Sequence, residues 1–315
     1  MRAWALCALL PFAVAAKEKV ILDTDIGADL DDQLAVAYIV QEPACELLGI
    51  TTVGSGSHVR ASMVSAICRH AGRDDVKIYP GVEYPLHGGR AGGGPNPPKC
   101  AEALAKWPHA DFPRGNVAVD FMRRAIRANP GEVTLIAIGH FSNVATLFAL
   151  DPEIPSLLKR FVAMGGNFSG GAEWNAVADP VATAIVYGDG RRPVPPEHLS
   201  VGNDVTCRCR LDEAEARAFF RKAKTLAPVA DLAEDWLSRA HSAVFHDPLA
   251  CVCVFHPEVC TYRKINVEVP LAAESAGYTL TKPHWAGGSK KEPRHTVATD
   301  VDRARFFEIY LSVVK

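Results

Sequence analysis

The chain has 315 residues, of which 48% are apolar and 22% charged, and its formal net charge is −2. A chain of this length can bury a large core and fits one or two domains. The near-balance of charge gives no electrostatic basis for binding a nucleic-acid polymer or a membrane surface, so we expect a small-molecule partner and neither of those.

The N-terminus has the composition of a secretory signal peptide. Met1 and Arg2 precede an apolar run that ends in small residues at Ala16, and charged residues begin at Lys17. The run is too short to span a membrane, and this order of regions is typical of a cleavable signal. We assign residues 1–16 to a signal peptide and residues 17–315 to one domain, and we predict a secreted or extracytoplasmic protein.

The cysteine count agrees with export. The chain has nine cysteines, and removal of Cys7 with the signal leaves eight, an even number that permits disulfides. The pairs at 207/209 and 251/253 lack the two-residue spacer of common zinc sites, so we expect some disulfides rather than a zinc site.

Short apolar stretches alternate with helical patterns along the chain. Continuous apolar strands between helices indicate a mostly parallel sheet covered on both faces. We therefore predict an α/β fold: an open, Rossmann-like sheet in a single domain with helical C-terminal additions. Strands are expected at residues 20–22, 47–53, 76–79, 133–138, 161–164 and 267–270, and helices at residues 30–40, 59–70, 143–150, 211–224, 228–243, 251–255, 300–314 and from Asp179 onward.

The segment of residues 84–115 interrupts this alternation. It is rich in glycine and proline and too long for a plain connector, so we expect a mobile lid or a surface excursion there.

Five aspartates lie within residues 23–32, directly after the first predicted strand. Like charges at this density repel one another unless a cation neutralises them or water surrounds them. Hard oxygen ligands at a strand end suit Ca²⁺ or Mg²⁺. The alternative is a solvated acidic turn that caps the next helix.

Two other metal-loop interpretations can be tested by counting. An EF-hand loop that began at Asp23 would need glutamate at its twelfth position, where the chain has Leu34, so this interpretation fails. A Mg²⁺-dependent phosphohydrolase with Asp23 or Asp25 as nucleophile fits the Asp-x-Asp spacing, but gives no role to the downstream segments.

Four segments, in this order, resemble the inosine/uridine-preferring nucleoside hydrolase family. Each follows a predicted strand or opens a predicted helix, and together they span about residues 19–257. They are Asp23-Thr24-Asp25-Ile26-Gly27 with Asp31-Asp32; residues 133–139 with Phe141-Ser142-Asn143; Met164-Gly165-Gly166-Asn167 with Glu173-Trp174-Asn175 and Asp179-Pro180; and His246-Asp247-Pro248.

The resemblance implies hydrolysis of the N-glycosidic bond between a ribose and its base. Such a reaction needs an activated water, groups that stabilise a positively charged sugar, and a way to neutralise the departing base. The family's metal is Ca²⁺, and the resemblance assigns its ligands to Asp25, Asp32, Asp247 and the backbone carbonyl of Ile138. Asp25 would also act as the general base that activates the water.

The resemblance also implies the contacts to substrate. His246 would give a proton or a hydrogen bond to the base, and Asn167 would lie near the ring oxygen, although as a lone residue it also fits a turn. The sugar would be bound by Asp31, Met164, Asn167, Glu173 and Asn175.

The sequence departs from the family pattern after the second strand, where an asparagine that contacts the sugar is missing. Ser55 and Ser57 are candidate replacements, and His87 and His109 are candidates for a further active-site histidine. The missing asparagine keeps open a second hypothesis, a secreted non-catalytic relative that acts as a binding protein. Base preference is also open, and so is the oligomeric state, for which we consider a homodimer or a homotetramer.

Overall fold

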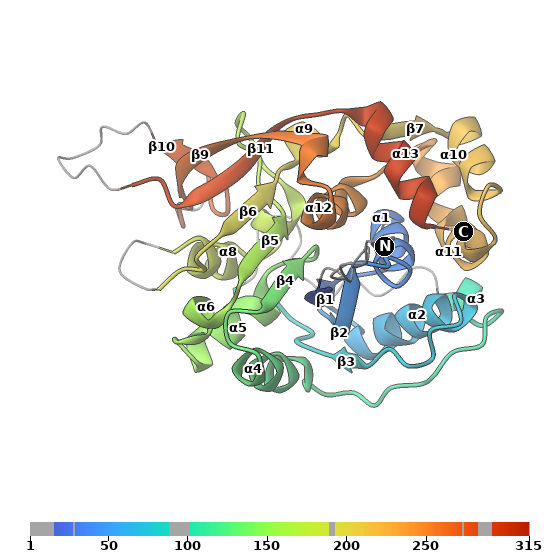
Figure 1. The fold of residues 1–315 in the computed structure, drawn as a ribbon, viewed down its shortest axis with the longest axis horizontal. Helices are drawn as coiled ribbons and strands as arrows, with labels where there is room; N and C mark the ends of the chain where they lie inside the picture. Colours follow the sequence, from blue (N-terminus) through green and yellow to red (C-terminus); the bar gives the residue numbers. More distant parts are fainter. Residues whose placement is uncertain are drawn as a thin grey trace, which may run out of the picture.

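A computed structural model describes residues 16–27, 29–87, 101–188, 193–272, 274–282 and 292–314. Within these residues the central sheet has nine strands in the order β10-β9-β11-β6-β5-β4-β1-β2-β3 (Figure 1). A separate antiparallel pair is formed by β7 (Arg210–Asp212) and β8 (Ser242–Val244). The sheet strands are β1 (Glu18–Thr24), β2 (Cys45–Thr52), β3 (Ile78–Pro80), β4 (Val133–Ala137), β5 (Arg160–Met164), β6 (His198–Val201), β9 (Cys260–Glu268), β10 (Leu280–Lys282) and β11 (His295–Val301).

The sheet is parallel from β3 to β11, and β9 and β10 continue it as antiparallel strands at one edge. Buried apolar runs explain the parallel part: β4 is fully buried, and β1 is buried from Val20 onward. Successive side chains of β1 enter different cores, because Val20 and Leu22 belong to one apolar cluster and Ile21 to the other.

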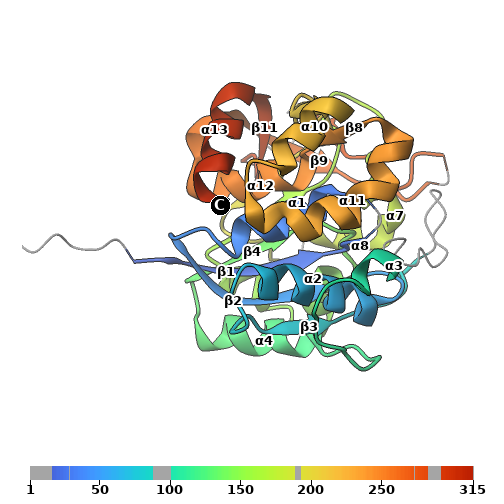
Figure 2. The same cartoon turned by 90° about the vertical axis from the view of Figure 1, so that its right-hand side faces the viewer.

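Helices cover both faces. One core packs the sheet against α1, α2 and the helices from α10 to α13, and the other packs it against α4, α5, α6 and α8. Figure 2 looks onto the side of the molecule that carries α1, α2, α11 and α13. The helices are α1 (Asp31–Ile39), α2 (Ser57–His70), α3 (Ala101–Leu104), α4 (Ala118–Ala128), α5 (Ser142–Leu150), α6 (Ile154–Leu157), α7 (Trp174–Ala178), α8 (Pro180–Tyr187), α9 (Asn203–Thr206), α10 (Glu213–Phe220), α11 (Ala227–Ala240), α12 (His246–Phe255) and α13 (Arg303–Val313).

The strand order reverses next to β1. The chain proceeds from β1 outward through β2 and β3, then returns to form β4 on the other side of β1 and continues outward through β5 and β6. The carboxyl ends of β1 and β4 therefore flank a topological switch point, the usual ligand crevice of an open parallel sheet.

The predicted fold class is confirmed, with corrections in the C-terminal third. Residues 211–224 are not one helix, because β7 includes Leu211 and α10 begins only after Asp212, whose side chain caps it in a capping box with Glu215. The terminal helix begins at Arg303 rather than at Asp300, which lies in β11. The C-terminal additions also include strands, since β9, β10 and β11 extend the sheet.

Several sequence expectations fall wholly or partly outside the described residues. Residues 1–15 of the predicted signal peptide and residues 88–100 of the glycine- and proline-rich segment belong to this group. The expected disulfides are absent among the seven described cysteines, all of which are free; the sulfurs of Cys253 and Cys260 lie 3.6 Å apart. Across the described part of the chain, no helix is both long and apolar enough to cross a membrane.

Candidate active site

A cavity of about 370 Å³ opens at the switch point. Its walls come from the turn after β1, from the ends of β4 and β5, and from α1, α7, α9, α11 and α12. The lining residues are Asp25, Asp29, Asp31, Asp32, Ile138, Met164, Glu173, Trp174, Asn175, Asn203, Trp236, His246 and Asp247.

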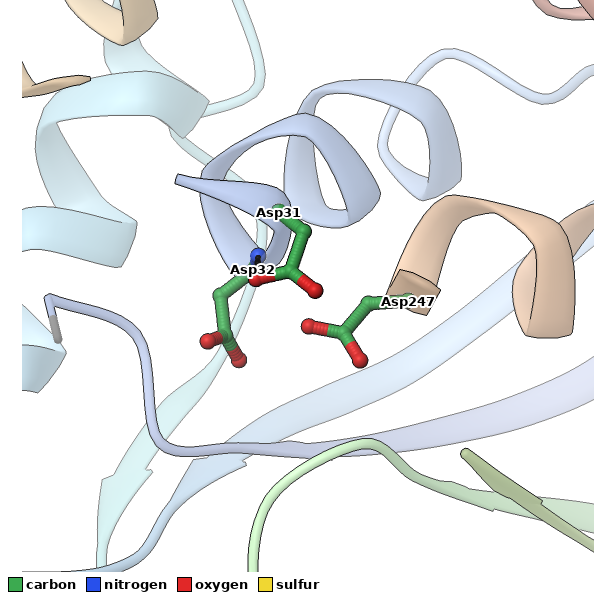
Figure 3. A group of neighbouring side chains, drawn as sticks. All are labelled: Asp31, Asp32 and Asp247. Carbon is green, nitrogen blue, oxygen red and sulfur yellow. Dashed lines mark hydrogen bonds between the residues drawn. The ribbon is translucent and has the colours of Figure 1, made fainter. Parts of the chain in front are cut away.

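Three carboxylates converge in this cavity from two helices (Figure 3). Asp31 and Asp32 open α1, Asp247 lies in the first turn of α12, and the two helices pack against each other. One oxygen from each carboxylate lies within 4.8 Å of the others, and all three residues are at least 95% buried. Oxygen donors at this spacing fit a hard divalent cation.

Burial raises the pKa of Asp31, Asp32 and Asp247 well above the ordinary range, and the neighbouring aspartates raise each further. Desolvation and like-charge repulsion both disfavour the ionised form. A bound cation removes both penalties by supplying the missing positive charge. The chemistry of this donor set therefore fits a metal site.

Asp25 lines the same cavity from the end of β1, although it is not one of the three carboxylates that lie within 4.8 Å. The chain passes very close to it at Gly139, where an added Cβ would lie 2.8 Å from the Asp25 Oδ1 atom. Glycine is therefore required at the end of β4 for the strand to pass beside this carboxylate.

The fully buried Arg60 of α2 holds the turn that carries Asp25. Its guanidinium donates to the backbone carbonyls of Asp25 and Ile26, and its Nε donates to the carbonyl of Ser55 at 3.0 Å. Its positive charge also lowers the pKa of Asp32, although burial of that carboxyl has the larger effect. The buried cation thus fixes the backbone of the acidic turn and offsets part of its charge.

Asp23, the first aspartate of the cluster, does not belong to the cavity. It is fully buried between strands and accepts hydrogen bonds from Thr51 at 2.6 Å and from Asn143 at 2.7 Å. Burial raises its pKa to about 7. This placement is unsuited to a nucleophile, so the phosphohydrolase hypothesis loses one of its two candidate aspartates.

Asn175 connects the ends of β4 and β5. Its amide Nδ2 donates to the carbonyl of Ile138 at 2.7 Å and to the carbonyl of Met164 at 3.1 Å. A carbonyl oxygen has two lone pairs, so this contact orients the Ile138 carbonyl and leaves one lone pair for a metal. The structure thus brings together Ile138, Met164 and Asn175, all of which the sequence assigned to the site.

Glu173 is the N-cap of α7. Its carboxylate accepts hydrogen bonds from the backbone N–H groups of Gly166, Asn175 and Ala176, at 2.8 to 3.0 Å. Burial nevertheless raises its pKa to about 7, because desolvation outweighs these three bonds. The same carboxylate that lines the cavity therefore fixes the loop between β5 and α7.

His246 is half-buried at the start of α12, and loss of hydration there lowers its pKa to about 4. Its ring Nδ1 lies 2.6 Å from the hydroxyl of Thr206 in α9. A ring with this pKa is neutral at pH 7, and a neutral imidazole that accepts at Nδ1 carries its proton on Nε2.

Asn167 is the predicted site residue that the structure does not bring into the cavity. Its Oδ1 accepts hydrogen bonds from the backbone N–H of Ser169 at 3.2 Å and from the Ser169 hydroxyl at 3.0 Å. This is an Asx turn, in which an asparagine side chain bonds the backbone two residues on. The turn role that the sequence also allowed is the one the structure shows.

Four further candidates also lie away from the cavity. Ser57 donates to the carbonyl of Gly81 at 2.9 Å, and Ser55 contributes only its carbonyl to Arg60, so neither hydroxyl replaces the missing asparagine. His87 does not line the cavity, and neither does His109, whose Nδ1 pairs with the carbonyl of Trp107.

The structure adds lining residues to which the sequence assigned no role. Asp29 was visible in the acidic cluster, and Trp174 lies between Glu173 and Asn175. Asn203 and Trp236 come from segments of weak periodicity, and no local pattern marks them.

The fold and the cavity define the class: an α/β enzyme with a buried acidic site at the switch point of its parallel sheet. Comparison with known proteins gives the family. The sequence profile described as inosine-uridine preferring nucleoside hydrolase matches residues 20–308, and the chain belongs to this family of metal-dependent enzymes that hydrolyse ribonucleosides.

Individual relatives agree with this assignment. The chain is 28% identical to "Probable uridine nucleosidase 1" of Oryza sativa subsp. japonica, over 84% of this chain and 85% of the relative. It is also 28% identical to the "Pyrimidine-specific ribonucleoside hydrolase RihA" of Salmonella arizonae, over 94% and 98% of the two chains.

Solved structures share the fold at lower identity. A plant nucleoside hydrolase superposes with a TM-score of 0.76 at 23% identity, over 94% of this chain and 98% of its own. A purine-preferring ribonucleoside hydrolase from Gardnerella vaginalis superposes with a TM-score of 0.77 at 24% identity, over 94% and 97%.

The raised pKa of Glu173 predicts a pH-dependent stability in metal-free protein. The folded carboxyl holds its proton up to about pH 7, whereas the unfolded one loses it near 4.5. The free energy of unfolding should therefore fall as pH rises from 5 to 7, by about 2 kcal/mol from this group. Urea unfolding in EDTA measures this slope.

Glu173→Gln should make the slope shallower, because the variant lacks one of the buried carboxyls with a raised pKa, while Asp23 and the three metal-site aspartates keep theirs. Glu132→Gln is the matched control, since the Glu132 side chain is 59% exposed and its removal should leave the slope unchanged. An equal slope in Glu173→Gln and the parent protein would show that Glu173 does not retain its proton.

Proposed function

We propose that this protein is a calcium-dependent ribonucleoside hydrolase that releases ribose and a free base. The observation that carries the proposal is the convergence of Asp31, Asp32 and Asp247 in one buried cavity with Glu173 and Asn175. An acidic metal-binding centre beside polar groups suited to ribose hydroxyls is what cleavage of the bond from C1′ to the base nitrogen requires.

Calcium suits the donor set better than magnesium. Ca²⁺ accepts six to eight oxygen ligands in flexible geometry, whereas Mg²⁺ keeps several waters and is seldom held in an all-protein cage. We assign the ion to two members of the group of three carboxylates, Asp32 and Asp247. Asp25, which lines the same cavity, and the Ile138 carbonyl complete the set that would hold it, and Asp31 is left for the sugar. When bound, a divalent cation supplies a more acidic water and a grip on ribose hydroxyls.

Residues of the chain activate the water and bind the sugar. Asp25 takes a proton from the attacking water at its carboxylate, as a general base. Asp31 and Glu173 accept hydrogen bonds from sugar hydroxyls, and Asn175 orients both the Ile138 carbonyl assigned to the ion and the Met164 carbonyl assigned to the sugar. These contacts orient the ribose and stabilise the positive charge that develops on its ring.

His246 is the residue that donates a hydrogen bond to the leaving base. With Nδ1 accepting from Thr206, its Nε2–H is the group that can donate to the base nitrogen. The depressed pKa makes this donor a neutral imidazole at pH 7, so it acts by donating a hydrogen bond from Nε2–H to the base nitrogen as negative charge builds on the base.

We also propose that the protein is exported, on the signal-like composition of residues 1–16. The N-terminal sequence of protein secreted from an expressing cell tests this directly. Cleavage after Ala16 supports export, whereas retention of Met1 in cell-associated protein contradicts it.

The function is tested by incubating metal-loaded protein with inosine, uridine and adenosine and measuring free ribose. Ribose should appear with at least one nucleoside, and Asp25→Asn should lower turnover by about 10³-fold or more, because it weakens both the base and the metal site. Asp120→Asn is the matched control, since the Asp120 side chain is 58% exposed on α4.

Near-normal turnover in a folded Asp25→Asn protein would contradict the mechanism. Release of no ribose from any of the three nucleosides would favour the alternative, a binding protein of the same fold.

A second prediction separates His246 from its neighbour. Asp247→Ala should abolish cleavage of both inosine and p-nitrophenyl riboside, because every substrate needs the metal. His246→Ala should lose inosine cleavage but keep much of its rate on the nitrophenyl substrate, whose leaving group departs without a proton donor. Equal losses on both substrates in His246→Ala would show that the histidine positions the sugar or the metal loop instead.

A further inference from the structure

The cavity has an end that the proposed mechanism leaves without a role. The carboxylates, Glu173 and Asn175 account for the metal and the sugar. The lining residues that remain are Asp29, Trp174, Asn203 and Trp236. Asp29 belongs to the acidic turn after β1, whereas the other three line the cavity from α7, α9 and α11, together with His246 of α12. Because His246 faces the leaving group in the proposed mechanism, these three residues surround the space that the base would occupy.

Asn203 is held rigidly by its backbone. Its N–H donates to the carbonyl of Gly166 at 2.9 Å, and its carbonyl accepts from Cys207 at 3.0 Å. The side-chain amide, in contrast, forms no hydrogen bond with any residue that the structure describes, and it lines the cavity while remaining half-buried. A fixed backbone with an unused amide in a cavity is a preorganised donor and acceptor for a ligand.

The helix α9 places this amide beside His246. Asn203 and Thr206 are three residues apart and so lie on one face of α9. The Thr206 hydroxyl contacts the His246 ring at 2.6 Å, and α9 packs against α12. The Asn203 side chain therefore lies one turn along the same face from the contact that orients the leaving-group donor.

Aromatic side chains complete this end of the cavity. Trp236 enters the wall from α11, and Trp174, which is 50% exposed, enters it from the first position of α7. Indole faces can stack on any planar base and so give affinity with little selectivity. Recognition of a particular edge must come from a polar group, and Asn203 is the polar residue of this wall besides His246.

We propose that the side chain of Asn203 recognises the base by hydrogen bonding to its edge, an inference that rests on the proposed hydrolase function. Its amide offers an acceptor beside a donor, so it matches a base edge that presents a donor beside an acceptor, such as the neighbouring N–H and carbonyl of hypoxanthine or uracil. A base that lacks this edge leaves the amide buried and unpaired in the complex, which lowers its rate of cleavage.

The test compares substrates that differ only at this edge. Inosine is paired with purine riboside, which lacks the 6-oxo group and the adjacent N–H, and uridine is paired with 2-pyrimidinone riboside, which lacks the equivalent pair. For whichever pair the parent enzyme cleaves, Asn203→Leu should reduce the ratio of the two kcat/KM values by roughly 10- to 100-fold. Leucine has nearly the size of asparagine, so the cavity keeps its shape.

The p-nitrophenyl riboside reports whether the metal and sugar groups still work in the variant, and its cleavage should remain measurable. A ratio that does not change, or an equal loss on both members of a pair, would overturn the role of Asn203 in reading the base. Absence of ribose release by the parent enzyme from every substrate is a different result, because it contradicts the proposed hydrolase function itself.

Discussion

The carboxylates gathered between α1 and α12 cannot all be ionised in a buried cavity unless a cation neutralises them. Two ionised carboxylates already repel strongly in a poorly solvated space, and here Asp25 and Asp29 line the same cavity as the group formed by Asp31, Asp32 and Asp247. In the protein without a cation, burial and this repulsion raise the pKa of each member of that group. The repulsion between these carboxylates opposes folding. Metal binding removes this repulsion and so stabilises the folded protein.

Much of the surrounding structure holds this unfavourable arrangement in place. Thr24 donates its hydroxyl to Asp32, and Arg60 supplies a buried positive charge to the turn after β1. Asn175 orients the Ile138 carbonyl at the end of the neighbouring strand β4. Each of these groups comes from a different part of the chain, and the switch point between β1 and β4 is where the sheet brings them together.

The sequence predicts what depends on local pattern. The apolar runs of β1 and β4 identify buried strands. The aspartates that follow β1 are so close together in the sequence that their charges repel one another, and this alone indicates a cation site. The position of these aspartates at the switch point follows from parallel topology. His246 and Asp247 are found by their short motif, although their distance to α1 is not encoded in it.

What the sequence does not reveal depends on long-range packing. Arg60 occupies an ordinary helical position, and its role comes from contact with a carbonyl 35 residues earlier in the chain. Asn203 and Trp236 reach the cavity because α9 packs against α12 and α11 packs against α1. Asn167 shows a local interaction instead: its side chain bonds the backbone of Ser169 outside the residues that line the cavity, and its expected contact with the sugar stays a prediction.

The measurement that tests the account most directly is calorimetric titration of calcium into metal-stripped protein, in two buffers of different ionisation enthalpy. We predict one ion bound per chain, with release of protons to the buffer, because carboxyls of raised pKa keep protons until a cation replaces them. Asp247→Ala should weaken or abolish this binding. Absence of saturable calcium binding in the parent protein, or unchanged binding in Asp247→Ala, would contradict a cation at the centre of this site.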